Sequence, residues 1–172
     1  MKGALSKIIE WIVCIVIAII LTFLLKTFLF DIIKVSGDSM YPTLHTKDML
    51  GVEKISLMNK DFKHGDIIIF DPGDKGEGIY IKRIVGLPGD TIEVKNGGVY
   101  VNNTHLNETY LSPNTYTEND LKLKLKEGYV FVLGDNREVS EDSRNIGPIP
   151  IQNIKGHAVF RFFPFTDMGS VK

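Results

Sequence analysis

Cysteine and concentrated positive charge are both scarce in this sequence. Only one of its 172 residues is a cysteine, Cys14. That count excludes a disulfide within the chain and a metal site built from paired cysteines. The chain has 20 basic and 21 acidic residues, for a net charge of −1, and it has no basic tail or stripe. We therefore expect no nucleic acid among its main partners.

Long uncharged runs are absent except near the N-terminus, where residues 11–25 contain no charged side chain. As an α-helix, residues 8–30 would be about 34 Å long, enough to cross a hydrocarbon core of about 30 Å. The run is apolar on every side, whereas a helix packed in a protein core is usually amphipathic. We predict that residues 1–7 form a short stub, residues 8–30 a transmembrane anchor, and residues 31–172 a domain outside the lipid.

A cleaved secretion signal is the main alternative for this N-terminal segment. Lys2 and Lys7 precede the apolar run, as they would in such a signal. The sequence after the run lacks the small residues of Ala-x-Ala type that a cleavable signal requires. We therefore favour an uncleaved anchor. Its orientation is not decided by charge, because Lys26 and Lys34 after the run balance the two lysines before it.

After residue 34 the pattern changes to short runs of β-branched and aromatic residues, separated by glycine, proline, asparagine and aspartate. This pattern is typical of an antiparallel, mostly-β domain. Asn96 and Gly97 supply the positive φ angles of a tight turn, so residues 91–102 are predicted to form a hairpin. Residues 102–126 are polar and weakly patterned, and we interpret them as a variable insertion. The predicted strands are residues 66–70, 79–85, 91–95, 98–102, 129–133 and 154–163.

Ser39 is the first residue that can carry chemistry. It lies between Gly37, which permits unusual backbone angles, and Pro42, which restricts the chain. Such a turn can expose a hydroxyl group with its own N–H pointing the same way, although an ordinary turn has the same composition. The segment is not a nucleophile elbow, because residues 37–41 lack the second glycine.

Lys82 is the candidate base for such a serine. At its ordinary pKa a lysine is neutral in only about one molecule in 2,500 at pH 7, so a lysine base must be buried among apolar groups. Strand alternation puts Lys82 on the face of Tyr80 and Ile84, and Arg83 on the other. We expect one of these two adjacent cations to point inward and the other to reach solvent. By itself, Lys82 also fits a solvated strand lysine.

A polar loop follows the predicted strand at residues 129–133. Its residues 134–144 (GDNREVSEDSR) contain acidic and basic side chains that can pair with each other or with the backbone. A well-capped turn has the same composition, so this segment alone does not identify a site. No recognisable triad pattern includes any of the histidines, which are His45, His64, His105 and His157.

Together these segments resemble bacterial type I signal peptidases in their short single-span form. The matching motifs are Ser-Met-x-Pro-Thr-Leu at residues 39–44, Lys-Arg-Ile-Val-Gly-Leu-Pro-Gly-Asp at 82–90, and Gly-Asp-Asn-Arg with Ser-x-Asp-Ser-Arg at 134–144. Lys-His-Gly-Asp-Ile-Ile-Ile-Phe at 63–70 resembles a fourth block. The resemblance implies a serine endopeptidase that removes N-terminal signal peptides from exported preproteins, cleaving after small residues of the Ala-x-Ala type.

The resemblance also implies a role for each matching residue. Ser39 matches the nucleophile and Lys82 the general base, while Ser140 matches a serine that hydrogen-bonds and orients the lysine. The residues that match supports of the site are Arg83, Asp142 and Arg144. Neither a cofactor nor a metal is implied. The stub would lie in the cytoplasm, and the catalytic domain would lie on the outer side of a bacterial plasma membrane.

Two departures from the family pattern affect these expectations. Some relatives carry a serine two positions before the nucleophile, where this chain has Gly37. The oxyanion hole is therefore expected to use backbone N–H groups, chiefly that of Ser39. Glu138 and Val139 replace the Asp-Asn pair of the family loop, which we interpret as changed packing with activity retained.

Two other functions fit part of the sequence. A self-cleaving regulator uses similar Ser/Lys chemistry, but such proteins are soluble and usually carry a DNA-binding domain. A catalytically inactive, membrane-anchored module would bind signal peptides without cutting them, but Ser39, Lys82 and Ser140 are all present. Residues 159–165 either touch lipid or form a core strand that runs into a turn, and we favour the strand.

Overall fold

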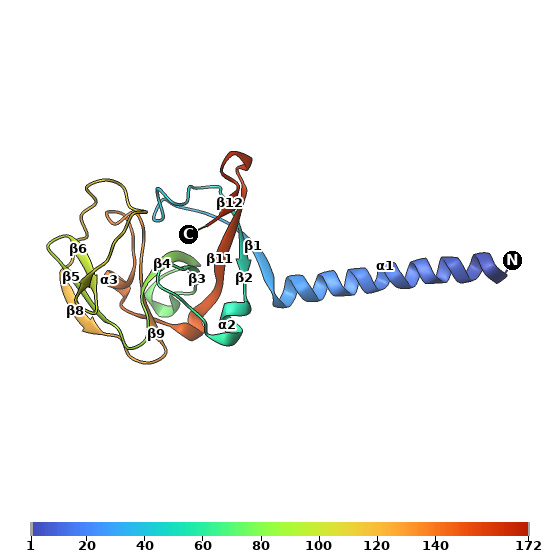
Figure 1. The fold of residues 1–172 in the computed structure, drawn as a ribbon, viewed down its shortest axis with the longest axis horizontal. Helices are drawn as coiled ribbons and strands as arrows, with labels where there is room; N and C mark the ends of the chain where they lie inside the picture. Colours follow the sequence, from blue (N-terminus) through green and yellow to red (C-terminus); the bar gives the residue numbers. More distant parts are fainter. Residues whose placement is uncertain (1, 172) are drawn as a thin grey trace.

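The computed structural model describes residues 2–171 as a long N-terminal helix joined to a β-rich body (Figure 1). Helix α1 comprises Lys2–Phe28, and strand β1 (Phe30–Lys34) follows almost at once. The predicted helix is present but ends before residue 30, because Phe30 already pairs with Glu53 in a sheet. Among the described residues, no helix is long and apolar enough to cross a membrane. The transmembrane anchor stays a prediction.

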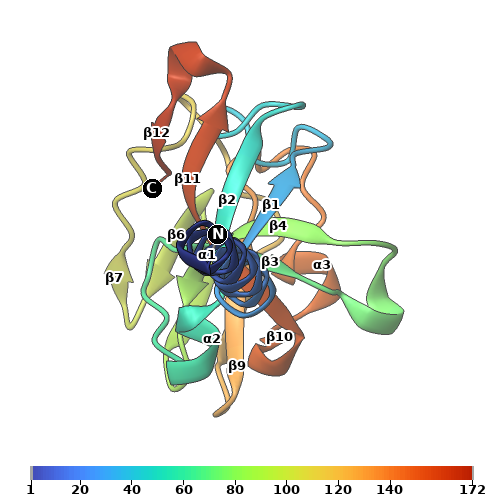
Figure 2. The ribbon, with the colours of Figure 1, turned by 90° about the vertical axis from the view of Figure 1, so that its right-hand side faces the viewer.

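The body contains a large antiparallel sheet. Besides β1, its strands are β2 (Met49–Glu53), β3 (Ile67–Phe70), β4 (Tyr80–Gly86), β9 (Tyr129–Leu133), β10 (Ile149–Pro150), β11 (Ile154–Phe163) and β12 (Gly169–Ser170). Their order is β1-β2-β11-β3-β4-β9-β10, with β12 paired to β11. Figure 2, seen nearly end-on along α1, shows β1, β2 and β11 as neighbours.

A smaller antiparallel sheet has the order β7-β6-β5-β8. Its strands are β5 (Thr91–Lys95), β6 (Gly98–Val101), β7 (Thr104–His105) and β8 (Leu121–Lys124). The predicted hairpin is confirmed, because Asn96 and Gly97 join β5 to β6 with φ angles of 51° and 77°. Strands β7 and β8 both come from residues 102–126, so this polar segment completes the sheet. Its variability stays a prediction.

Alternation along the central strands separates two apolar cores. In β3, Ile68 and Phe70 belong to one buried cluster, and Ile67 and Ile69 belong to another. Because both faces of the strand are covered, its sequence is continuously apolar and does not alternate with polar residues.

Strand β4 lies where these cores meet a third. Ile84 packs in the first cluster, Ile81 against the second, and Val85 in the third, which joins the two sheets. The residues between them, Lys82 and Arg83, are consequently drawn into the interior despite their charge.

The segment after residue 158 ends the large sheet. Residues 159–163 belong to β11, and the chain then turns, so the favoured interpretation of a core strand running into a turn is right about the strand and the turn but wrong about the core, since no residue from 159 to 165 is buried. Its tip is not in the core, because Phe162, Phe163 and Phe165 are all exposed. The remaining helical segments are α2 (Ile55–Asn59), α3 (Ser143–Ile146), η1 (Gly73–Lys75), η2 (Ile151–Asn153) and η3 (Phe165–Asp167).

Candidate active site

Ser39 lies in the loop between β1 and β2. The Val35 N–H donates to the Asp48 carbonyl at 2.8 Å and closes the loop, and the buried side chain of Met40 holds it against the core. Gly37 has a φ angle of +89°, in the region that favours glycine. The predicted turn is therefore present, and Ser39 is half-buried.

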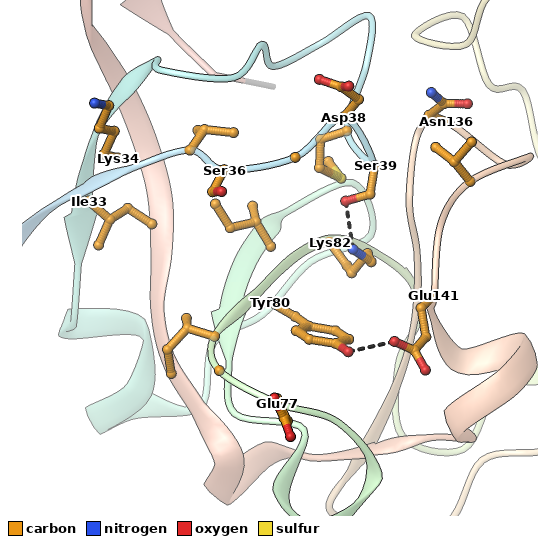
Figure 3. A pocket seen from close by; sticks show the side chains of 17 residues that line it. Ile33, Lys34, Ser36, Asp38, Ser39, Glu77, Tyr80, Lys82, Asn136 and Glu141 are labelled. Atoms are coloured by element: carbon orange, nitrogen blue, oxygen red, sulfur yellow. Dashed lines mark hydrogen bonds between the residues drawn. The ribbon is translucent and has the colours of Figure 1, made fainter.

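In the structure, the side chain of Lys82 lies beside that of Ser39. Lys82 lies on β4, and its side chain is only 4% exposed. Its Nζ atom is 2.7 Å from Ser39 Oγ, within hydrogen-bond distance (Figure 3). A neutral amine at this distance can accept the serine proton.

Burial changes the basicity of Lys82. Loss of hydration lowers the pKa of Lys82 from 10.5 to about 8. Three carboxylates act against this effect and raise its pKa, those of Asp142, Glu141 and Asp135. At pH 8 about half of the lysines are then neutral, against roughly one in 300 at the ordinary pKa. The structure thus meets the requirement that a lysine base be desolvated.

The neighbouring cation, Arg83, is also buried, with 2% of its surface exposed. Its Nε and Nη2 atoms donate to the Asp135 carboxylate at 2.9 and 2.6 Å. The expectation that one of two adjacent cations reaches solvent is wrong, because this carboxylate neutralises Arg83 inside the protein. Thr43 donates to the same carboxylate, which ties the loop of Ser39 to the ion pair.

Asp142 and Arg144 form a second buried ion pair. Arg144 Nε and Nη2 donate to the two carboxylate oxygens, each at 2.9 Å. The same carboxylate accepts from the Gly134 N–H at 3.0 Å, and Arg144 donates to the Arg137 carbonyl at 2.8 Å. Both ends of the 134–144 loop are therefore joined, which fits a supporting role for this pair.

Ser140 lies inside the same loop and is 7% exposed. It packs so closely that a Cβ atom on Gly134 would lie 2.1 Å from Ser140 Oγ. This hydroxyl oxygen makes no hydrogen bond to any group that the structure describes. The hydrogen bond to Lys82 that the resemblance implies is therefore not formed in this conformation, and the role of Ser140 stays a prediction.

Residues 102–126 contribute to the site, although nothing in their pattern indicates it. The Arg137 guanidinium donates to Glu108 and to Thr117, and the Arg83 guanidinium lies 3.9 Å from the centre of the Tyr110 ring. Burial raises the pKa of the Tyr110 hydroxyl. These contacts join side chains at least 20 positions apart, so no local signal predicts them.

A cleft of about 880 Å³ opens beside Ser39 and Lys82. Residues 33–40 form one wall and residues 77–82 the other, and Asn136 and Glu141 lie at the end near Ser39 (Figure 3). Val139 also lines the cleft. Of the two family departures in the loop, the exposed Val139 thus lines the cleft, whereas Glu138 does not.

None of the four histidines, all among the described residues, lines the cleft. Within residues 2–171, no three histidine, cysteine, aspartate or glutamate side chains lie close enough together to hold a metal ion.

Comparisons with known proteins agree with these features. The family model described as "Signal peptidase, peptidase S26" matches residues 8–163. A signal peptidase I of Bacillus licheniformis is 40% identical, covering 95% of this chain and 92% of its own. Signal peptidase I S of Bacillus subtilis is 39% identical, covering 95% and 93%. The crystal structure of a signal peptidase I from Enterococcus faecalis is 33% identical with a TM-score of 0.50, covering 56% of this chain and 96% of that one.

Every protein named in these comparisons is a peptidase, and this chain is therefore a peptidase as well. More narrowly, the chain belongs to the signal peptidases of peptidase family S26. The enterococcal structure also agrees with the antiparallel, mostly-β fold predicted from the sequence.

Replacing Asp142 with alanine is expected to destabilise the folded protein by about 3–5 kcal/mol, because a buried guanidinium and a buried N–H lose their acceptor. Urea unfolding of the full chain, followed by circular dichroism, measures the change. Asp31→Ala is the matched control, since the Asp31–Lys54 pair is at the surface with a 3.6 Å separation. Its loss is expected to cost less than about 1 kcal/mol. Equal losses in the two variants would contradict a supporting role for Asp142.

Proposed function

We propose that this protein removes N-terminal signal peptides from exported preproteins, with Ser39 as the nucleophile and Lys82 as the general base. The observation that carries the proposal is the 2.7 Å separation of Lys82 Nζ and Ser39 Oγ. The burial that lowers the pKa of Lys82 to about 8 supports the base role, because it makes a neutral amine available near neutral pH.

In the first half of the reaction, the neutral Lys82 amine takes the Ser39 proton while Ser39 Oγ attacks the scissile carbonyl carbon. The protonated amine then gives this proton to the leaving nitrogen, the C–N bond breaks, and an ester forms on Ser39. In the second half, Lys82 takes a proton from water, and the hydroxide attacks the ester. The acid leaves, and the Ser39 oxygen recovers the proton from Lys82.

The carbonyl oxygen becomes negatively charged in each tetrahedral intermediate and needs hydrogen-bond donors. The Ser39 N–H makes no hydrogen bond to any described group, so it is available for this purpose. Gly37 brings no hydroxyl to the site, and the oxyanion hole is therefore built from backbone donors.

Ser140 is proposed to orient Lys82 in the second half of the reaction. Once Ser39 Oγ is part of an ester, the Lys82 amine loses that hydrogen-bond partner. The Ser140 hydroxyl is buried in the adjoining loop and has no partner among the described residues, so rotation of its side chain offers the amine a replacement. A buried hydroxyl without a partner is rare in proteins, which supports a role of this kind.

The supports of the site act through their ion pairs. Arg83 holds Asp135, and Arg144 holds Asp142, so neither carboxylate is free to move toward the Lys82 amine. Loss of either pair would displace the loop that contains Ser140.

The cleft suits an extended peptide with small side chains. Ile33 and Ile81 supply apolar surface on its two walls, and Val35 and Met40 are themselves buried beneath it. Extended backbone on both walls, from β1 and from the start of β4, suits pairing with a substrate strand. These features support binding of an extended, apolar peptide, and cleavage after small residues of the Ala-x-Ala type is proposed from the family resemblance.

The membrane location is also a proposal: α1 anchors the domain in a bacterial plasma membrane, with residues 1–7 in the cytoplasm and the cleft outside. Large apolar side chains of α1 are exposed, among them Trp11 at 73%, Ile17 at 58% and Phe23 at 67%. Such a surface is unfavourable in water and favourable in lipid. Because β1 connects α1 directly to the loop of Ser39, the anchor would hold the cleft where the cleavage site of a preprotein leaves the bilayer.

Ser39→Ala and Lys82→Met are each expected to lower cleavage of a preprotein with an Ala-x-Ala site at least about a thousandfold, because each removes a reacting group. Turnover by the full chain in detergent is measured, and N-terminal sequencing of the product locates the cut. His105→Ala is the control and is expected to retain activity, since His105 lies outside the cleft. Cleavage that survives Lys82→Met would sink the proposed base. A folded wild type that binds the preprotein without cutting it would identify a binding module.

The value of kcat/KM is expected to rise about tenfold per pH unit in acid and to level off above the pKa of Lys82, about 8. The direction follows because only the neutral amine takes the serine proton. Initial rates between about pH 6 and pH 10 test this. A midpoint near 10.5 would mean that Lys82 is solvated, and one near 6.5 would point to a histidine instead.

Replacing Ile17 and Ile20 together with arginine is expected to release the protein from membranes, since each arginine costs about 2.5–3.5 kcal/mol at the centre of a spanning helix. Alkaline extraction of membranes from expressing cells, followed by immunoblotting, measures the bound fraction. The matched control replaces the same two residues with leucine and should stay bound. Retention of the arginine variant in the extracted membranes would contradict the anchor.

A further inference from the structure

A hydrogen bond crosses the cleft beside the candidate base. The Tyr80 hydroxyl donates to Glu141 Oε2 at 2.6 Å (Figure 3). Tyr80 lies on β4, two residues before Lys82, whereas Glu141 belongs to the loop of residues 134–144. The bond therefore links the strand that carries the base to the loop that faces it.

Tyr80 also contacts the base directly. Lys82 Nζ lies 5.2 Å from the centre of the Tyr80 ring, a distance at which a cation is attracted to the face of an aromatic ring. The hydrogen bond to Glu141 fixes the far end of this ring. The surface against which the lysine packs therefore depends on the position of Glu141.

Glu141 lies between two buried residues of the loop. Ser140 before it is 7% exposed, and Asp142 after it is 0% exposed. Because both neighbours are buried, the backbone at Glu141 is held in place, and its exposed side chain is the part that can change.

The Glu141 carboxylate acts on the amine through its charge as well. The Ser39 hydroxyl and the Tyr80 ring are in contact with the amine, and Glu77 acts on Tyr80 from the same wall of the cleft. The carboxylates that face the amine are those of Asp135, Glu141 and Asp142. Both aspartates are paired with arginines. Among the described residues, Glu141 is held by a tyrosine hydroxyl and by no cation.

We propose that Tyr80 and Glu141 are positioning residues: their hydrogen bond holds Lys82 against Ser39, and the Glu141 charge sets the pH range in which the pair works. The inference rests on the proposed function, because both residues act through Lys82. It goes beyond the family motif, since Glu141 occupies the unspecified position of Ser-x-Asp-Ser-Arg.

Two conservative variants separate the hydrogen bond from the charge. Glu141→Gln keeps an oxygen acceptor for Tyr80 but removes the negative charge, so Lys82 loses its proton more readily. The acid limb of the pH profile, in which kcat/KM rises with pH, is expected to move to lower pH. Tyr80→Phe keeps the ring and the Glu141 charge but breaks the bond. Its kcat is expected to fall about threefold to tenfold with KM unchanged.

The assay uses the full chain in detergent or lipid, with a preprotein that carries an Ala-x-Ala site, and measures kcat and KM between about pH 6 and pH 10. Glu138→Gln is the matched control, because Glu138 is an exposed carboxylate of the same loop that lies outside the cleft. It is expected to leave kcat and the acid limb unchanged. The double variant Tyr80→Phe/Glu141→Ala is expected to be no slower than Glu141→Ala alone, since both changes break one contact.

An acid limb in Glu141→Gln that coincides with the wild-type limb would overturn the inference. Rate losses that add in the double variant would overturn it as well, because the two residues would then act independently. An equal shift in Glu138→Gln would do the same, since it would reflect the charge of the whole loop. All three results differ from failure of the proposed function, in which the wild type itself does not cleave.

Discussion

The burial of one lysine amine is the constraint around which this site is arranged. A buried ammonium group costs free energy, and Lys82 avoids part of that cost by releasing its proton, which is why its pKa falls to about 8. Such burial requires secure apolar packing, which β4 obtains from its position among three apolar clusters. The basicity of Lys82 is therefore a property of the whole sheet more than of its immediate neighbours.

Two ion pairs weaken the effect of the carboxylates that raise the pKa of Lys82. Asp135 is neutralised by Arg83, and Asp142 by Arg144, in each case through two hydrogen bonds. A guanidinium in such close contact offsets much of the attraction that the carboxylate exerts on a nearby amine. The same pairs fix the loop of residues 134–144. The two ion pairs thus stabilise the site without raising the pKa of Lys82 back to its ordinary value.

The sequence predicts those parts of the molecule that depend on local pattern. The hairpin at residues 91–102 and four further strands follow from short runs of β-branched and aromatic residues and from the turn residues between them, which are neighbours in the chain. The approach of Ser39 to Lys82 followed from the family motifs, not from their spacing. The burial of Arg83 and the contacts of residues 102–126 were beyond prediction, because they depend on partners 52 and at least 20 positions away.

In the loop of residues 134–144, the residues that fix the loop differ from the residue that acts on the basicity of Lys82. Three contacts fix the loop of residues 134–144: Asn136 N–H with the Ser39 carbonyl at 3.0 Å, Arg137 with Glu108, and Asp142 with Arg144. Glu141 is exposed and held by a single side-chain hydrogen bond, so a change there need not unfold the loop. It is also the carboxylate whose charge reaches Lys82 without an arginine to offset it. A residue with those two properties can alter the basicity of Lys82 independently of the fold.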